Sequence, residues 1–365
     1  LASYHRNIFY RCHLTELRWH YQTEKLEISA RLPLNITYER LTEWRPKGEQ
    51  SHLRREIFTW PQLTFRMKGV ELFFDMQHRS PSQTLMLDVR DDSNPLAVYL
   101  GNPSLKSSYE YCLAAKWAGF KQEEMRQWSL DLSIFTVDNA IGQLRQFNPL
   151  TGGYTYTPWN IDGNGELKAS GSFSQSVGKE RHWFLNVGTI VKLNRSVDFS
   201  NTSETVDFQK SIVHNLHVSP SLGIDYRYSK WYAAFKASAD WERLTSEQEG
   251  FETLSQVDLL YTLSLNAPLP FDVNLNTDFN LFMRRGYGDQ TMNTNEWVWN
   301  ISLNRYIDKR KTWLMKLSVH DLLGQLSAVR RTLNAQGRVE VVSNTITRNV
   351  MLHLIWKFNR KPSKS

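Results

Sequence analysis

Hydrophobic and polar residues alternate along most of this chain, and the segment 271–283 shows the pattern most clearly. One face of that segment is apolar, and the other carries amides and carboxylates. The polar positions are Asp272, Asn274, Asn276, Asp278 and Asn280. Because successive side chains of a β-strand point to opposite faces, this alternation predicts one strand with an apolar side and a wet side.

The segment 231–241 has the same alternation and ends in tryptophan on both sides, at Trp231 and Trp241. Ten residues of strand span roughly 33 Å, which a tilt of about 45° reduces to about 24 Å, close to the ~25 Å apolar band of an outer-membrane barrel. Tryptophan is enriched at membrane interfaces. A soluble β-sandwich explains one such strand, but it does not explain their repetition along the chain.

Repetition of this pattern predicts an all-β fold, an antiparallel up-and-down transmembrane β-barrel with about 14–16 strands present. The predicted strands are residues 8–22, 26–40, 53–66, 70–79, 108–119, 126–137, 158–177, 182–195, 210–228, 231–245, 251–266, 270–285, 294–306, 311–322 and 346–359. We therefore expect residues 1–359 to form the barrel wall and residues 360–365 to form a polar periplasmic tail.

The predicted connections alternate between short turns and long loops. The long ones are 41–52, 80–107, 138–157, 196–209 and 323–345. Outer-membrane barrels have short periplasmic turns and longer outer loops. The long connections are therefore expected outside the cell, with the last strand running down toward the periplasm.

Composition agrees with a barrel in the outer membrane of a Gram-negative bacterium. The chain is 41% hydrophobic and 13% aromatic, and its mean hydropathy of −0.50 fits a wall that has a wet interior. No apolar run approaches the ~18 residues of a membrane-spanning helix, and only a closed barrel satisfies the backbone in lipid without helices. The net charge of +7 is scattered along the chain, so we expect no nucleic-acid partner.

Sequence motifs for catalysis, cofactors or metals are lacking. There is no phosphate-binding glycine loop, no paired-histidine zinc motif and no nucleophile elbow, so we expect no enzyme, no catalytic residues and no cofactor. Asn160, Asp162 and Asn164 imitate the start of a calcium loop. Its twelfth position is Gly171, where a bidentate glutamate is needed, so no metal site is expected there.

Ligand-binding candidates lie in the predicted lumen and in the outer loops. The polar positions 272–280 face the predicted interior, where they either bind a solute or merely keep the lumen hydrated. Tyr99 and Trp159 fall in or beside long connections, where they could stack on a sugar or siderophore or belong to the outer aromatic girdle.

Three motifs resemble TonB-dependent receptors of the Bacteroidetes type. Residues 91–106 read DDSNPLAVYLGNPSLK, residues 157–171 read TPWNIDGNGELKASG, and residues 319–331 read VHDLLGQLSAVRR. They occur in the order that the family has, over most of the chain from about residue 54. The resemblance implies that the chain is the C-terminal part of a 22-stranded barrel.

The same resemblance implies partners and a function. The partners are the outer-membrane lipid bilayer, a plug domain, a TonB-type energy-coupling protein and a surface lipoprotein, and the function is uptake of a scarce siderophore, glycan or peptide. If the chain is complete, it closes with 14 or 16 strands. The alternative functions are a non-energised pore, an adhesin or an assembly barrel, and a secreted soluble lectin is a third reading.

Overall fold

The computed structural model describes residues 5–45, 48–88, 90–201, 209–247, 251–288, 290–326, 329–334, 337–342 and 348–358. These residues form one 20-stranded sheet and one two-stranded sheet, with helix α1 (Gln83–Met86) and 3-10 helix η1 (Gln290–Met292) in outer connections. No helix among them has the length and apolarity to cross a membrane. The predicted all-β antiparallel class is confirmed, and the predicted tail 360–365 lies outside the described residues.

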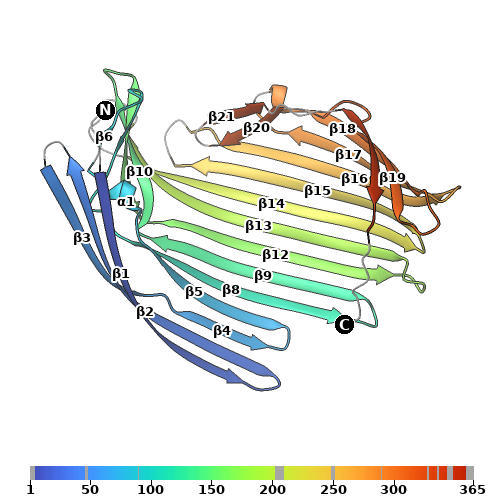
Figure 1. Ribbon diagram of the computed structural model, residues 1–365, viewed down its shortest axis with the longest axis horizontal. Coiled ribbons are helices and arrows are strands. Elements are labelled where there is room, and N and C mark those ends of the chain that lie inside the picture. The colour runs from blue at the N-terminus through green and yellow to red at the C-terminus, as the bar shows by residue number, and fades with distance from the viewer. Residues whose placement is uncertain are drawn as a thin grey trace.

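The wall is a meander in which each long strand pairs with the next one along the chain (Figure 1). Fifteen lengths of strand cross it within the described residues. They are β1 (His5–Gln22), β2 (Leu26–Arg45), β3 (Gly48–Thr59) with β4 (Gln62–Met67), β5 (Val70–Arg79), β8 (Ser108–Lys121), β9 (Arg126–Asp138), β12 (Asn164–Val177), β13 (Trp183–Asn201), β14 (Gln209–Tyr228), β15 (Trp231–Ser246), β16 (Leu254–Leu269), β17 (Val273–Arg285), β18 (Asn295–Tyr306), β19 (Trp313–His320) and β22 (Asn349–Trp356).

Strands β3 and β4 are one length of strand interrupted at Pro61. Both pair with β2, since Leu34 lies opposite Thr59 and Arg31 lies opposite Gln62. Proline has no N–H to donate to a sheet ladder, so the strand breaks where it occurs. The carbonyl of Pro61 accepts a hydrogen bond from the Met76 N–H at 3.1 Å, which joins the break to β5.

Each of the five predicted outer connections contains some regular structure among the described residues. The connection predicted at 41–52 is wrong, because β2 and β3 extend through it and remain paired from Leu34–Thr59 to Arg45–Gly48. Residues 138–157 mostly form the hairpin of β10 (Ala140–Asn148) and β11 (Gly153–Ile161), and the segment 323–345 contains the hairpin of β20 (Val329–Asn334) and β21 (Gly337–Val342).

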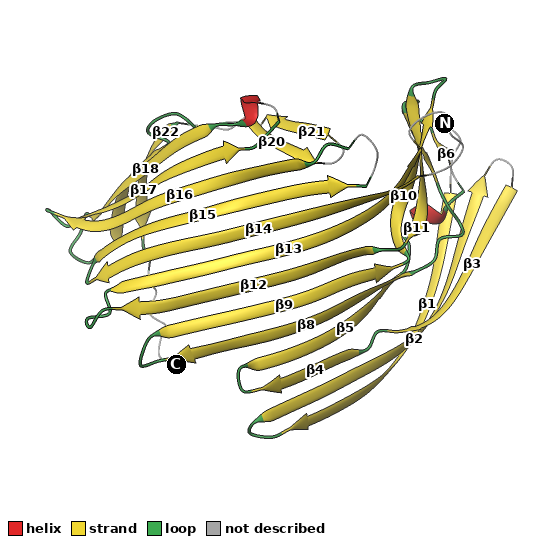
Figure 2. Cartoon of the chain, turned by 180° about the vertical axis from the view of Figure 1, so that it is seen from behind, coloured by secondary structure: helices red, strands yellow, loops and turns green. Residues whose placement is uncertain are grey.

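Short outer strands of the 20-stranded sheet gather around the β10–β11 hairpin, where β11 pairs in parallel with β7 (Ala97–Leu100) and β7 pairs with β6 (Arg90–Asp91). The buried apolar side chains here include Leu87, Leu105 and Ile161, the last only 1% exposed. This outer knob, residues 80–88 and 90–107 with 138–163, projects from the same end of the wall as the other long connections (Figure 2).

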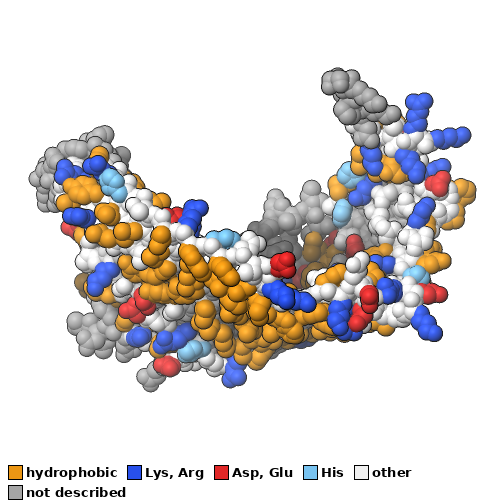
Figure 3. Space-filling model, turned by 90° about the horizontal axis from the view of Figure 1, so that it is seen from below, with side chains coloured by type: hydrophobic (Ala, Val, Ile, Leu, Met, Phe, Trp, Pro, Cys, Tyr) orange, Lys and Arg blue, Asp and Glu red, His pale blue; other side chains and the backbone are white. Residues whose placement is uncertain are grey.

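The wall curves into a trough, and hydrophobic side chains gather along it when it is seen from below (Figure 3). Register places Leu113, Ile134, Leu167 and Leu193 in one row across β8, β9, β12 and β13. Each of these leucine and isoleucine side chains is 43–54% exposed. A contiguous apolar row exposed to this degree is suited to lipid rather than to water.

Aromatic residues line the wall at the short-turn ends of the strands. Trp117 packs edge-on against Trp128, with 6.1 Å between ring centroids, and Trp313 stacks on Trp356 at 5.8 Å. Trp231 opens β15, and Trp241 follows ten residues later on the same face. Such bands are typical of the two interfaces of a transmembrane barrel.

The two outermost strands, β1 and β22, run in the same direction, because fourteen reversals separate them along the meander. Their side chains are exposed on both faces: in β1, Tyr10 is 59% and Leu17 68% exposed, and in β22, Leu352 is 70% exposed. Within the described residues, each of the two strands pairs with one neighbour only, β2 and β19.

The turn between β18 and β19 depends on Asp308, whose carboxylate accepts hydrogen bonds from the Thr312 hydroxyl and from the N–H groups of Thr312 and Trp313 at 2.6–3.1 Å. These donors, the Thr312 hydroxyl first, lower the pKa of Asp308 to about 2. The stabilisation is present above the ordinary carboxylate pKa of about 3.9 and is lost as the pH falls through about 2.

We therefore expect Asp308→Asn to lower the urea midpoint of unfolding in lipid vesicles at pH 7. The difference from the native chain should shrink as the pH falls from about 4 to below 2. Lys309→Gln, at an exposed position in the same turn, is the control and should leave the midpoint unchanged at both ends of this range. A deficit in Asp308→Asn that persists below pH 2 would contradict the role of the ionised carboxylate.

Candidate functional site

Two parts of the molecule carry the residues that sequence reasoning selected, and they lie at different places on the wall. Tyr99 and Trp159 belong to the outer knob, whereas residues 274–280 belong to β17, toward the opposite side of the sheet (Figure 1). The predicted candidates therefore do not form one site.

The outer knob is fastened by two of the sequence motifs. The amide Nδ2 of Asn102 donates to the carbonyl of Pro158 at 2.9 Å, and its Oδ1 accepts from the Ser104 N–H at 3.0 Å. A Cβ added at Gly101 would lie 1.4 Å from the Leu87 carbonyl oxygen, so only glycine permits this close approach. The GNP element thus joins the 80–107 connection to β11.

Asn160 completes this junction from the other side. Its side chain accepts from the Lys106 N–H at 2.7 Å and donates to the carbonyls of Lys106 and Asn139 at 3.0 and 2.9 Å. Asp162 accepts from the Asn139 N–H, and Asn164 accepts from the Val197 N–H. The side-chain oxygens of Asn160, Asp162 and Asn164, which imitate a calcium loop, therefore accept hydrogen bonds from backbone N–H groups. No group of three or more His, Cys, Asp or Glu side chains is placed to hold a metal ion in the described ranges.

The knob presents an aromatic stack. Tyr99 of β7 stacks on Tyr156 of β11 with 5.1 Å between centroids, Tyr154 tilts against Tyr156 at 6.3 Å, and the Arg145 guanidinium lies 5.0 Å from the Tyr154 ring centroid. Tyr99 is 47% exposed. Trp159, three residues beyond Tyr156 on β11, faces the opposite side of that strand, so Tyr99 and Trp159 are not neighbours.

The polar row predicted for the lumen lies on one face of β17, except at its first member. Asn274, Asn276 and Asp278 lie opposite Asn304, Ser302 and Asn300 of β18. Asp272 is not in the strand, because Phe271 and Asp272 both have positive φ, 63° and 56°, and form the turn before Val273. The alternation of the sequence continues into this turn although the strand does not.

Some side chains of this polar row form hydrogen bonds with other residues of the wall. Thr262 donates to the Asn280 Oδ1 at 2.8 Å, and Ser264 donates to the Asp278 Oδ1 at the same distance. The Asn300 Oδ1 accepts from the N–H of Asp321, a residue 1% exposed that caps the start of the outer connection beyond β19. These bonds tie the lumenal face of β16–β18 together.

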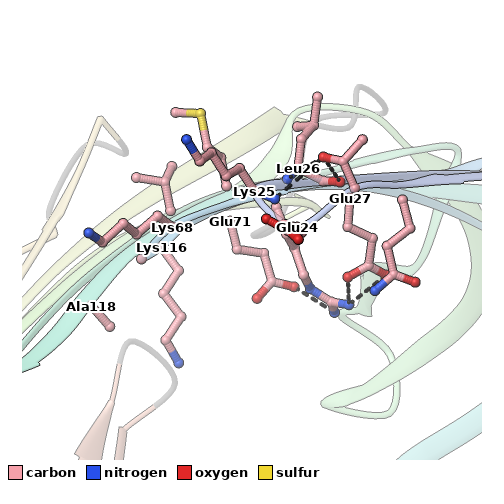
Figure 4. A pocket seen from close by; sticks show the side chains of 14 residues that line it. Glu24, Lys25, Leu26, Glu27, Lys68, Glu71, Lys116 and Ala118 are labelled. Atoms are coloured by element: carbon pink, nitrogen blue, oxygen red, sulfur yellow. Dashed lines mark hydrogen bonds and ion pairs between the residues drawn. The ribbon is translucent and has the colours of Figure 1, made fainter.

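A ladder of alternating charges crosses the lumenal face nearer the N-terminal edge. Register aligns Glu27, Arg66, Glu71, Lys116 and Asp131 across β2, β4, β5, β8 and β9. Arg66 pairs with Glu27 at 3.3 Å and Glu71 at 3.0 Å, and Lys116 lies 3.8 Å from Asp131. Figure 4 draws these contacts of Glu27 and Glu71 as dashed lines. Sequence reasoning missed this ladder, because its members pair only through strand register.

A second feature missed from the sequence is a bay of about 530 Å³ on the lumenal face of β12–β16, called the lumenal bay from here on. Two adjacent rows of mostly small residues form its floor. One row is Ser174, Asn186, Gly223, Lys236 and Thr262, and the other is Ser172, Gly188, Ser221, Ser238 and Leu260. The first row continues to Asn280, the last member of the predicted polar row.

Comparison with solved structures finds three forms of OmpT, an outer membrane protein of Vibrio cholerae. The in-vitro folded form is 10% identical with a TM-score of 0.33, covering 97% of both chains. The trimer form is 11% identical with a TM-score of 0.33, covering 97% of this chain and 99% of that one. A loop L8 deletion mutant has a TM-score of 0.27. No family model matches the chain, and no curated protein matches it.

The geometry of the wall itself gives its location. An antiparallel meander with an exposed apolar face, aromatic rows at the strand ends and a polar opposite face is a membrane-spanning β-sheet. Sheets of this kind lie in bacterial outer membranes. The chain is therefore a transmembrane β-barrel protein of the outer-membrane type.

Proposed function

We propose that this chain forms part of the wall of a wide, plugged outer-membrane barrel that takes up a scarce solute, as TonB-dependent receptors do. The observation that carries the proposal is the direction of the two outermost strands. Both β1 and β22 run toward the short-turn end, so joining them directly would create a parallel seam. Single-chain bacterial barrels are antiparallel with even strand numbers.

Closure of an antiparallel barrel therefore needs an odd number of further strands that begin and end with an upward one. Seven would give the 22 strands of the receptors that the sequence motifs resemble. A barrel of that size has a lumen wide enough to hold a plug, whereas barrels of 16–18 strands leave an open channel. A plug domain and a TonB-type energy-coupling protein are therefore part of the proposal.

The two faces of the wall support this role. The lumenal face carries amides, hydroxyls and paired charges that suit a hydrated plug surface, such as the Glu27–Arg66–Glu71 group. The aromatic stack around Tyr99 and Tyr156 lies in the outer knob, where a siderophore, glycan or peptide would first be met. A surface lipoprotein would contact the wall at the same outer knob.

Growth on limiting nutrients tests the proposal. In the native strain, one deletion removes this gene and another removes the TonB-type energy-coupling gene, and both are grown on a panel in which iron, cobalamin or one glycan at a time is limiting. Energised uptake predicts that the two strains fail on the same nutrient. Failure of the first strain alone, with normal growth of the second on that nutrient, would overturn the proposal in favour of a passive pore.

A further inference from the structure

The lumenal bay has the features of a binding site for a small solute. It is hollowed because Gly188, Gly223 and four serines bring no bulky side chain to its floor. Larger side chains stand at its lower rim, where the Arg227 guanidinium lies 4.8 Å from the Phe184 ring centroid and 5.8 Å from the Tyr232 ring centroid. A volume of about 530 Å³ lies within the range of small-molecule sites.

The polar groups of the bay are held by one another. Ser174 donates to the Asn186 Oδ1 at 2.7 Å, and the Asn186 Nδ2 donates to the Asp225 Oδ2 at 3.3 Å. The same carboxylate oxygen accepts from Arg227 at 2.9 Å. This chain of contacts fixes which way the Asn186 amide points. The floor is therefore ordered before any solute arrives, which reduces the entropic cost of binding.

Two charged groups of the bay are left with unused bonding capacity. The Asp225 side chain is 5% exposed, yet its Oδ1 has no hydrogen-bond partner among the described residues. A buried acceptor without a donor is costly, so an added donor is favourable there. Lys236 is exposed and forms no hydrogen bond or ion pair with any described residue, so its ammonium offers up to three donors.

These groups are spaced to act on one molecule. Lys236 lies opposite Gly223, and Asp225 lies opposite Ala234, so the two charged residues are diagonal neighbours on one face of β14 and β15. Diagonal neighbours in a sheet are about 7–8 Å apart, which is close to the width of a sugar ring with its substituents. Ser221 and Ser238 add hydroxyls in the next row.

We propose that the lumenal bay binds a hydroxyl-rich solute that carries one acid group, of the class of the sugar acids. The acid group pairs with the Lys236 ammonium, a ring hydroxyl donates to the Asp225 Oδ1, and the serine and asparagine side chains bind the remaining hydroxyls. This inference deepens the proposed uptake function and rests on it, because it names the chemical class that the barrel would pass inward.

Calorimetric titration of the full protein, purified in detergent, tests the site with glucuronate and with glucose as its neutral counterpart. We expect glucuronate to bind at least tenfold more tightly than glucose. Lys236→Gln should weaken glucuronate binding at least tenfold with little effect on glucose, and Lys236→Arg should retain most of the affinity. Lys168→Gln, which removes a positive charge from β12 outside the bay, is the matched control and should bind as the native protein does.

A second variant fills the bay without removing a charge. A Cβ at Gly223 would lie 3.6 Å from Asn186 and Lys236 carbons, an ordinary contact, so Gly223→Val should fold and bind glucuronate at least tenfold more weakly. Equal affinity for the two sugars, no binding of glucuronate, or no effect of Lys236→Gln would overturn the assignment. Titration needs no energy source, so loss of uptake with intact binding would count against the proposed function alone.

Discussion

Replacing Ala237 by arginine is expected to destabilise the folded wall by about 2–4 kcal/mol, the range for a lipid-facing charge near the bilayer midplane. Ala237 lies near the centre of β15, in a row with Leu222 of β14 and Tyr261 of β16. Phe235, two residues earlier on the same face, is 42% exposed, as lipid contact requires. Phe235→Arg should therefore also be destabilising.

The matched control is Ser238→Arg, one residue along β15 and therefore on the opposite, lumenal face. Its guanidinium would remain in water, so we expect a cost well below that at Ala237. Urea unfolding in lipid vesicles measures all three variants. Equal costs at Ala237 and Ser238 would contradict the assignment of the two faces.

The course of the wall could be predicted from the sequence because the alternation of apolar and polar residues within each strand shows which of its faces meets lipid and which meets water. In β15 and β17 the two-residue period arises from lipid on one side and water on the other, and no distant contact is needed to read it. The two-residue period does not predict the end of the strand at Asp272. Phe271 and Asp272 both have positive φ and form a turn, although hydrophobic and polar residues still alternate there. Alternation records the face of a residue only while the chain remains extended.

The outer knob and the lumenal sites depend on residues far apart in the chain, which is why the sequence does not show them. Asn102 meets Pro158 across 56 residues, and the connection appears in the sequence only as a run of turn-forming residues. The lumenal bay arises where Gly188, Ser221 and Ser238 of three strands come into register. A single glycine or serine in a strand carries no local sign of such a neighbourhood.

Disulfide cross-linking tests the second large expectation, that β1 and β22 do not close the barrel against each other. After Cys12 and Cys112 are changed to serine, the pair Leu17→Cys with Leu32→Cys joins residues directly opposite on β1 and β2 and should oxidise almost completely. Leu17→Cys with Leu352→Cys places the thiols on the lipid faces of β1 and β22. We expect only background disulfide from that second pair in outer membranes.

The physical reason is the common direction of the two strands. A second copy of the chain in the same membrane orientation presents the same downward strands at both edges, so it cannot supply the antiparallel partner either, and only a segment whose edge strands run upward can. Efficient disulfide formation between positions 17 and 352 within one chain would show that the fifteen strands close with a parallel seam. That result would remove the basis for a larger plugged barrel, whereas cross-linking between chains would leave the seam open and point to an oligomer.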